Sequence, residues 1–242
     1  MGIFNLFGTK EDDGHYRPVH GRELAYFREI LSTLVLKGLT EKDGRIRAED
    51  AITLMAVIAA ERCIDAAGDI PLRDHDLVPG SRVFSDKINS LLFGVSRGGT
   101  WESLPAFSSF GCLRDQLLAQ GFQKTDFPDL KEILEHFAAN IGKEEAWGTV
   151  PLSVPKENFP RMSPLKIGFE SRQSVDTLLR QLPDKFSKLT ASLWALAEIL
   201  SQTKQSLAPP TALRLAAEIL NGMAKTAPMV KKAMDNSKSI DN

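Results

Sequence analysis

The amino-acid sequence predicts an all-α protein, in which an N-terminal helical bundle is joined by a proline-rich extended strap to a C-terminal antiparallel helical hairpin. Apolar residues recur at spacings of three and four along most of the chain, whereas strict two-residue alternation is almost absent. A cluster of prolines interrupts this pattern between residues 148 and 170. After that cluster the spacing becomes that of a heptad repeat, which is typical of paired helices.

The first part of the chain is expected to hold a leader at 1–20 and a helical domain at 21–147. Helices are predicted at 21–37, at 48–67, from Ser81 or Ser85 to Gly94, at 105–120, and from about 126 to Gly142. The second of these is apolar nearly all round between 51 and 60, so it belongs in the middle of a bundle. Its charged end, which begins at Glu61 and Arg62, is expected to contact water.

The second part of the chain divides into three predicted segments. Residues 148–170 form the strap, because prolines recur there every four or five residues and no helix runs through such a series: Pro151, Pro155, Pro160 and Pro164. Residues 171–235 form the helical hairpin region, beginning with a helix at 171–181, and residues 236–242 form a disordered tail. The net charge also differs along the chain, since residues 171–242 are net basic and residues 1–170 are net acidic.

Two apolar seams dominate the hairpin region. One runs from Phe186 to Leu207 and the other from Leu213 to Met234, and Ala208, Pro209 and Pro210 separate them. Such a short connection favours antiparallel packing of the two helices. Pro228 is expected to end or bend the second helix after about Lys225. The residues assigned to the interaction seam are Leu193, Leu196, Leu200, Leu207, Leu213, Leu220 and Met223.

Further apolar residues lie outside these seams, so each helix needs a cover on a second side: Trp194, Ala197, Ile199, Leu215 and Ile219. Three alternatives for what packs on this second side remain open: the rest of this chain, a second copy in a four-helix bundle, or another protein. The sequence therefore predicts an adaptor that acts through helix-face association, either as a homodimer or with a different partner.

Composition limits the other classes of function. The 242 residues are 43% hydrophobic and 25% charged with a formal net charge of −1, as in an ordinary globular protein, and no nucleic-acid partner is expected. Cys63 and Cys112 lie far apart and outside any metal-binding spacing, which favours reduced thiols in a cytoplasmic protein. Neither a Walker loop nor a G-x-G-x-x-G motif occurs, so no cofactor and no metal site are assigned.

An alternative function is a helical hydrolase or an anion- or metal-binding enzyme. Two imidazoles and two guanidinium groups gather just before the first predicted helix, where a helix N-terminus favours anions. The candidate anion-binding residues are His15, Arg17, His20 and Arg22.

The chain also begins with an apolar tip, formed by Ile3, Phe4, Leu6 and Phe7. This tip is expected to lie on the body of the protein, and weak peripheral contact with a lipid surface stays open. Integral membrane contact is not expected, because no apolar run approaches the length that crosses a bilayer.

Overall fold

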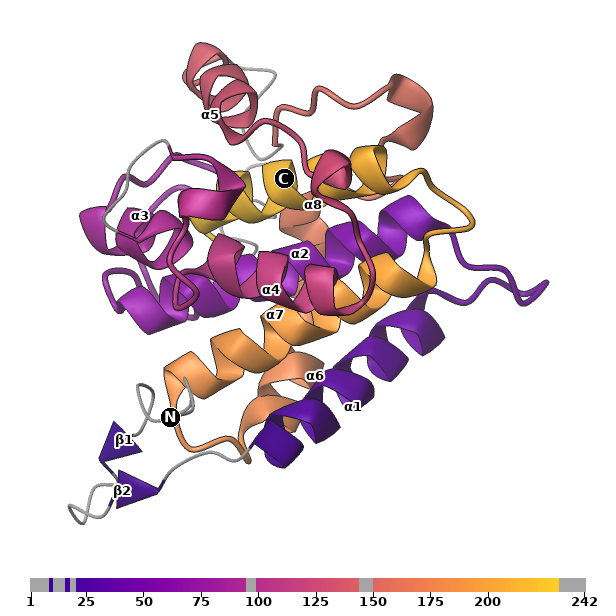
Figure 1. The fold of residues 1–242 in the computed structure, drawn as a ribbon. Helices are drawn as coiled ribbons and strands as arrows, with labels where there is room; N and C mark the ends of the chain where they lie inside the picture. Colours follow the sequence, from indigo (N-terminus) through magenta and orange to yellow (C-terminus); the bar gives the residue numbers. More distant parts are fainter. Residues whose placement is uncertain (1–8, 11–15, 18–20, 95–98, 144–149, 231–242) are drawn as a thin grey trace, which may run out of the picture.

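The structure is a computed structural model that describes residues 9–10, 16–17, 21–94, 99–143 and 150–230 (Figure 1). The described residues form eight α-helices, which confirms the all-α fold class. Strands β1 (Thr9–Lys10) and β2 (Tyr16–Arg17) pair antiparallel in a short ribbon before the first helix. The tail expected at 236–242 and the apolar tip lie outside the described residues.

Five helices occupy the region before the strap: α1 (Gly21–Leu39), α2 (Ala48–Ala67), α3 (Asp86–Phe93), α4 (Ser109–Ala119) and α5 (Leu130–Ala139). The predicted bounds of α2 are confirmed, and Gly68 ends that helix in the left-handed conformation with a φ of 71°. Ser85 caps α3 by accepting a hydrogen bond from the Ile88 amide at 3.2 Å. α4 begins later than predicted, because Ser108 rather than Pro105 supplies its N-terminal cap.

Three helices follow the strap: α6 (Pro164–Leu179), α7 (Lys185–Gln202) and α8 (Pro209–Ala224). α6 begins seven residues before the expected start at 171. Pro164 occupies its first turn, where the missing amide has no partner inside the helix and the fixed φ of proline already suits it. The extended strap is correspondingly shorter, and its described part contains the 3-10 turn η5 (Lys156–Asn158).

α2 lies at the centre of the molecule, with α7 on one side and α8 on another (Figure 1). Every residue from Ala48 to Ile64 except Glu49 is buried, as expected for a helix in the middle of a bundle. The expectation that Glu61 and Arg62 contact water is wrong, because α6 covers them and supplies charged partners.

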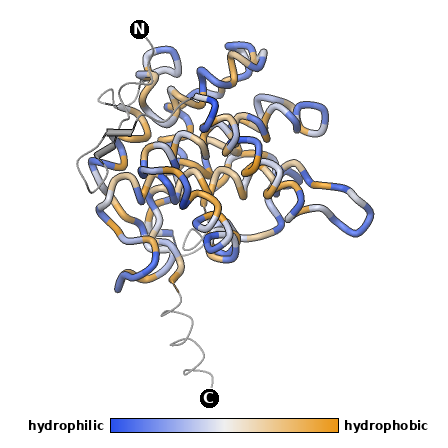
Figure 2. The backbone as a smooth tube through the Cα atoms, turned by 90° about the horizontal axis from the view of Figure 1, so that it is seen from below, coloured by the Kyte–Doolittle hydropathy of each residue, from blue (hydrophilic) through white to orange (hydrophobic). Residues whose placement is uncertain are grey.

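The two seam helices follow each other across a short turn, but they contact each other very little. α2 lies between them, and α1 and α4 cover further sides of α7. The physical reason is the all-round apolar surface of α2, which needs a helix on several sides. Figure 2 shows the hydrophobic stretches in the interior and hydrophilic stretches at the periphery. One continuous core runs from Leu24 to Ala224, so the regions 21–147 and 171–235 share it.

The second seam ends as a helix at Ala224, close to the end expected from Pro228. The described residues after it, 225–230, are mostly buried, and they pair with the segment before α3 through an isolated antiparallel bridge between Thr226 and Arg82. The Val83 amide donates to the Lys225 carbonyl and the Ala227 amide to the Ser81 carbonyl, each at 2.8 Å. Among the described helices, none combines the length and the apolar character needed to cross a bilayer.

Candidate functional site

Only two residues of the predicted anion cluster, Arg17 and Arg22, lie in the part of the chain that the structure describes. Arg22 lies in the first turn of α1 and is exposed, and Arg17 belongs to β2. His15 and His20 lie outside the described residues, so the enzyme hypothesis stays a prediction. The described part of the chain holds no group of three or more histidine, cysteine, aspartate or glutamate side chains placed to bind a metal ion.

The predicted interaction seam lies in the interior. All seven of its residues are buried, with Leu207 the most exposed at 8%. Four of the five apolar residues outside the seams are also buried, so the rest of this chain is the cover for most of both helices. The seam residues stabilise the fold and present no surface to a partner. The exception is Trp194, which is only partly buried.

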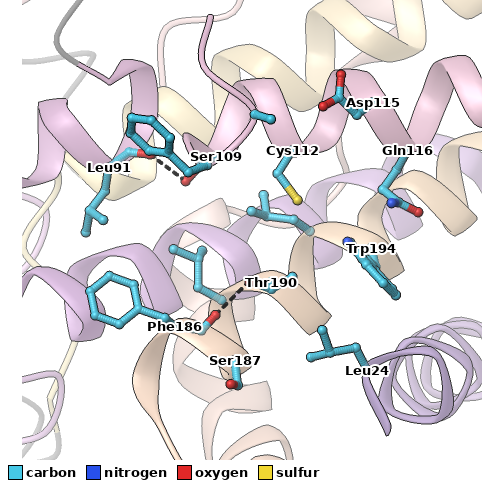
Figure 3. Close-up of a pocket in the computed structure, with 14 residues that line it drawn as sticks. Leu24, Leu91, Ser109, Cys112, Asp115, Gln116, Phe186, Ser187, Thr190 and Trp194 are labelled. Carbon is cyan, nitrogen blue, oxygen red and sulfur yellow. Dashed lines mark hydrogen bonds between the residues drawn. The ribbon is translucent and has the colours of Figure 1, made fainter. Parts of the chain in front are cut away.

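Trp194 marks an apolar pocket of about 150 Å³ between α1, α4 and the first turns of α7 (Figure 3). Cys112 of α4 and Leu24 of α1 line it from different sides, and α7 contributes Phe186, Thr190 and Trp194. The side chains of Cys112 and Trp194 point toward one another across the pocket. Phe186 and Phe107 lie at its margin with exposed fractions of 38% and 53%.

The hydroxyl groups around this pocket are held by local hydrogen bonds. Ser109 donates to the Leu91 carbonyl at 3.0 Å and Thr190 to the Phe186 carbonyl at 2.9 Å (Figure 3). Ser187 donates to Asp184, the carboxylate that caps α7. Each hydroxyl already has an acceptor, so the surface that the pocket offers to a ligand is mainly apolar.

Cys112 does not give the pocket a nucleophile. Burial raises the pKa of its thiol to about 12, although a hydrogen bond with Trp194 acts in the opposite direction. Burial likewise raises the pKa of Cys63 to about 12. The thiolate is the reactive form of cysteine, so both side chains are unreactive at neutral pH. The arrangement supports binding rather than covalent chemistry.

The chain has no significant match to a protein-family model, to a curated protein or to a solved structure. Function is therefore argued from the geometry of this chain alone. The sequence drew attention to Phe186 and Trp194 on α7. It could not identify Leu24, Phe107 or Cys112 as their neighbours, because these residues reach the pocket only through the packing of α1 and α4 on α7.

Proposed function

We propose that this protein is a cytoplasmic adaptor, which binds a partner protein by accepting one large apolar side chain in the pocket between α1, α4 and α7. The observation that carries the proposal is the size and lining of that pocket. A cavity of about 150 Å³ accommodates one benzene-sized group. Cofactor and drug-sized ligand sites usually begin at about 300 Å³.

The margin of the pocket supports the same function. Phe107 comes from the loop before α4 and Phe186 from the first turn of α7, and both rings are partly exposed. Aromatic side chains around a small desolvated pocket are typical of the centre of a protein interface. The partner that fits is an amphipathic segment that presents one leucine, phenylalanine or tryptophan side chain.

N-acetyl-tryptophanamide is a suitable probe, because it carries one large apolar side chain and no net charge. We expect it to shift backbone amide resonances of α4 and α7 in a two-dimensional NMR titration. The variant F107A/F186A should weaken this binding, because two aromatic contacts at the margin are lost. The control variant F84A removes an exposed ring outside the pocket and should leave the titration unchanged.

Two outcomes separate the possible partners. If wild-type protein sediments as a dimer and Phe186→Glu makes it monomeric, then the partner is a second copy. If the protein stays monomeric, a photo-crosslinking residue at position 107 should capture a different partner, and F186E should abolish that capture. A titration that shifts no resonance of the pocket would overturn the proposal.

A further inference from the structure

A second pocket, of about 470 Å³, opens where the end of α2 meets the end of α6 and the start of α7. This volume lies within the range of sites for small molecules, about 300–1,000 Å³. We call it the basic pocket, because five of its lining side chains are basic and only two are acidic. The basic residues are Arg62, Arg73, Arg180, Lys185 and Lys188.

The wall behind this pocket contains one buried ion pair that is fully satisfied. Arg172 donates to both carboxylate oxygens of Glu61, from Nε at 3.0 Å and from Nη2 at 2.6 Å. Its Nη1 donates to the carbonyls of Met229 and Leu72, at 2.6 and 3.2 Å. Arg172 and Glu61 therefore neutralise each other, and their hydrogen-bonding groups are satisfied within the chain without a ligand.

Arg62, the next residue on α2, is buried to the same degree but is not satisfied. Its Nη1 donates to Oδ1 of Asp176 at 2.6 Å. Its Nε and Nη2 are buried and have no hydrogen-bond partner among the described residues, since Oε2 of Glu61 is 3.7 Å from Nη2. Buried guanidinium nitrogens without hydrogen-bond acceptors are costly, so the positive charge of Arg62 is only partly compensated within the described chain.

Asp176 cannot neutralise Arg62 alone, because Arg73 also binds it. Arg73 donates from Nε to Oδ2 of Asp176 at 3.1 Å, so one carboxylate is shared by two guanidinium groups. Burial raises the pKa of Asp176, but Arg62 and Arg73 together outweigh burial and hold this pKa below its usual value. With Asp176 ionised, Arg62, Arg73 and Asp176 together carry a net charge of about +1 on this wall.

The mouth of the pocket adds to this excess of positive charge. Lys185 pairs with Asp65, the second acidic residue, at 3.2 Å. Arg180 and Lys188 form no ion pair with another described residue. Ile70, Pro71 and Leu72 provide an apolar wall beside these charges.

We propose that the basic pocket binds a small molecule that carries a phosphate monoester. The phosphate lies between Arg180 and Lys188, whose side chains form no ion pair with another described residue, and the positive charge of Arg62 in the wall behind them adds to the attraction. The uncharged part of the molecule packs against Ile70, Pro71 and Leu72. This site is separate from the apolar pocket, and the proposal does not depend on the adaptor function.

The proposal is tested by isothermal titration with phenyl phosphate, which combines the phosphate with an apolar body. We expect one site per chain and a dissociation constant that rises with salt. The variant R180A/K188A should weaken binding about tenfold or more, since it removes the two cations of the pocket that form no ion pair with another described residue. The control K42A/R45A removes two positive charges at the opposite end of α2 and should bind as wild type does.

A second variant addresses the buried arginine itself. Arg62→Met should weaken binding while Arg73 still pairs with Asp176, and circular dichroism verifies that the protein is folded. If R62M does not fold, the R180A/K188A comparison decides alone. Absence of binding heat in the wild type, or equal binding by R180A/K188A and its control, would overturn the proposal.

The source of the phosphate is distinguished by vesicles of phosphatidylcholine with 10% phosphatidic acid, a composition of about one charged lipid in ten that limits non-specific attraction. Binding of phenyl phosphate without sedimentation on these vesicles identifies a free metabolite as the ligand. Sedimentation that R180A/K188A abolishes and K42A/R45A retains identifies the phosphate of a membrane lipid. Absence of phenyl phosphate binding overturns the phosphate site whatever the vesicles show, and it leaves the tryptophanamide result of the apolar pocket unaffected.

Discussion

The first turns of α7 have two faces of opposite chemistry. Lys185 and Lys188, three residues apart, line the basic pocket, whereas Phe186 and Thr190, four residues apart, line the apolar pocket. Both spacings place residues on the same side of a helix. One short stretch of helix therefore lines two pockets of different chemistry. The apolar positions of this stretch indicate only one of the two.

The two pockets also differ in the polar and charged residues that lie in the walls behind them. Serine and threonine hydroxyls around the apolar pocket donate to neighbouring backbone carbonyls or to the capping carboxylate of Asp184, and no buried arginine or lysine among the described residues lines that pocket. Behind the basic pocket, Glu61, Arg62 and Arg172 are all buried. Binding in the apolar pocket should therefore change little with salt, while binding and stability at the basic pocket depend on charge.

Replacing Arg172 with methionine has the largest effect that we expect. Glu61 would stay buried without its partner, which costs about 3–5 kcal/mol of the free energy of unfolding. Urea unfolding followed by circular dichroism measures this loss. The double variant E61M/R172M should recover most of it, because no charge is then left unpaired. A loss by R172M of less than about 1 kcal/mol, as at an exposed ion pair, would contradict the role of this pair.

Lys225 is a second buried cation, and it differs from Arg62 because lysine can lose its proton. Its Nζ donates to Oδ1 of Asn221 at 2.7 Å and lies 5.3 Å from the centre of the Phe93 ring. Burial lowers the pKa of Lys225 from 10.5 to about 8, although nearby Cys63 acts in the opposite direction. The buried charge thus costs stability at neutral pH.

This pKa predicts a pH dependence of a definite sign. Between pH 8 and 10.5 the unfolded chain binds the lysine proton more strongly than the folded protein does, so this residue's contribution to stability rises with pH. The free energy of unfolding of wild type should gain about 3 kcal/mol relative to Lys225→Met across this interval. Cys63 is present in both proteins, so its own titration largely cancels. Parallel stability curves for the two proteins would refute the prediction.

A smaller effect is expected on the apolar side, at the cap of α4. Ser108 accepts a hydrogen bond from the Gly111 amide at 3.1 Å and donates to the Pro105 carbonyl at 2.8 Å. Ser108→Ala should lower the free energy of unfolding by about 1 kcal/mol. Ser103→Ala, at an exposed serine, is the control and should change stability by less than about 0.5 kcal/mol. Equal melting temperatures for the two variants would exclude a capping role.

The segments that form helices were predictable from the sequence, because helix formation depends on local patterns. The apolar run of α2 and the glycine after it fix that helix at both ends. The start of α6 was not predictable in the same way, because Pro164 is compatible both with an extended strap and with the first turn of a helix. Spacing identified most of the apolar residues that are buried on α7 and α8, with Phe186 as an exposed exception, but it could not reveal that α2 lies between the two helices.

The pockets show the same limit. Trp194 and Phe186 were visible as apolar residues on α7, yet their partners on α1 and α4 are determined by tertiary packing. The charged pair Glu61 and Arg62 follows directly after an apolar run, and this is the one local signal of a buried ionic site. Its partners Arg172 and Asp176 are more than a hundred residues away, at sequence separations of 111 and 114.

The central position of α2 has a consequence for how the protein is made. The ribosome synthesises α2 well before its two main neighbours, α7 and α8, which follow α6 in the chain. Until then the nascent chain carries a strongly apolar segment without its native cover, a state that is prone to aggregation and that chaperones recognise. A product truncated before residue 185 should therefore be insoluble, and folding should await the synthesis of both α7 and α8.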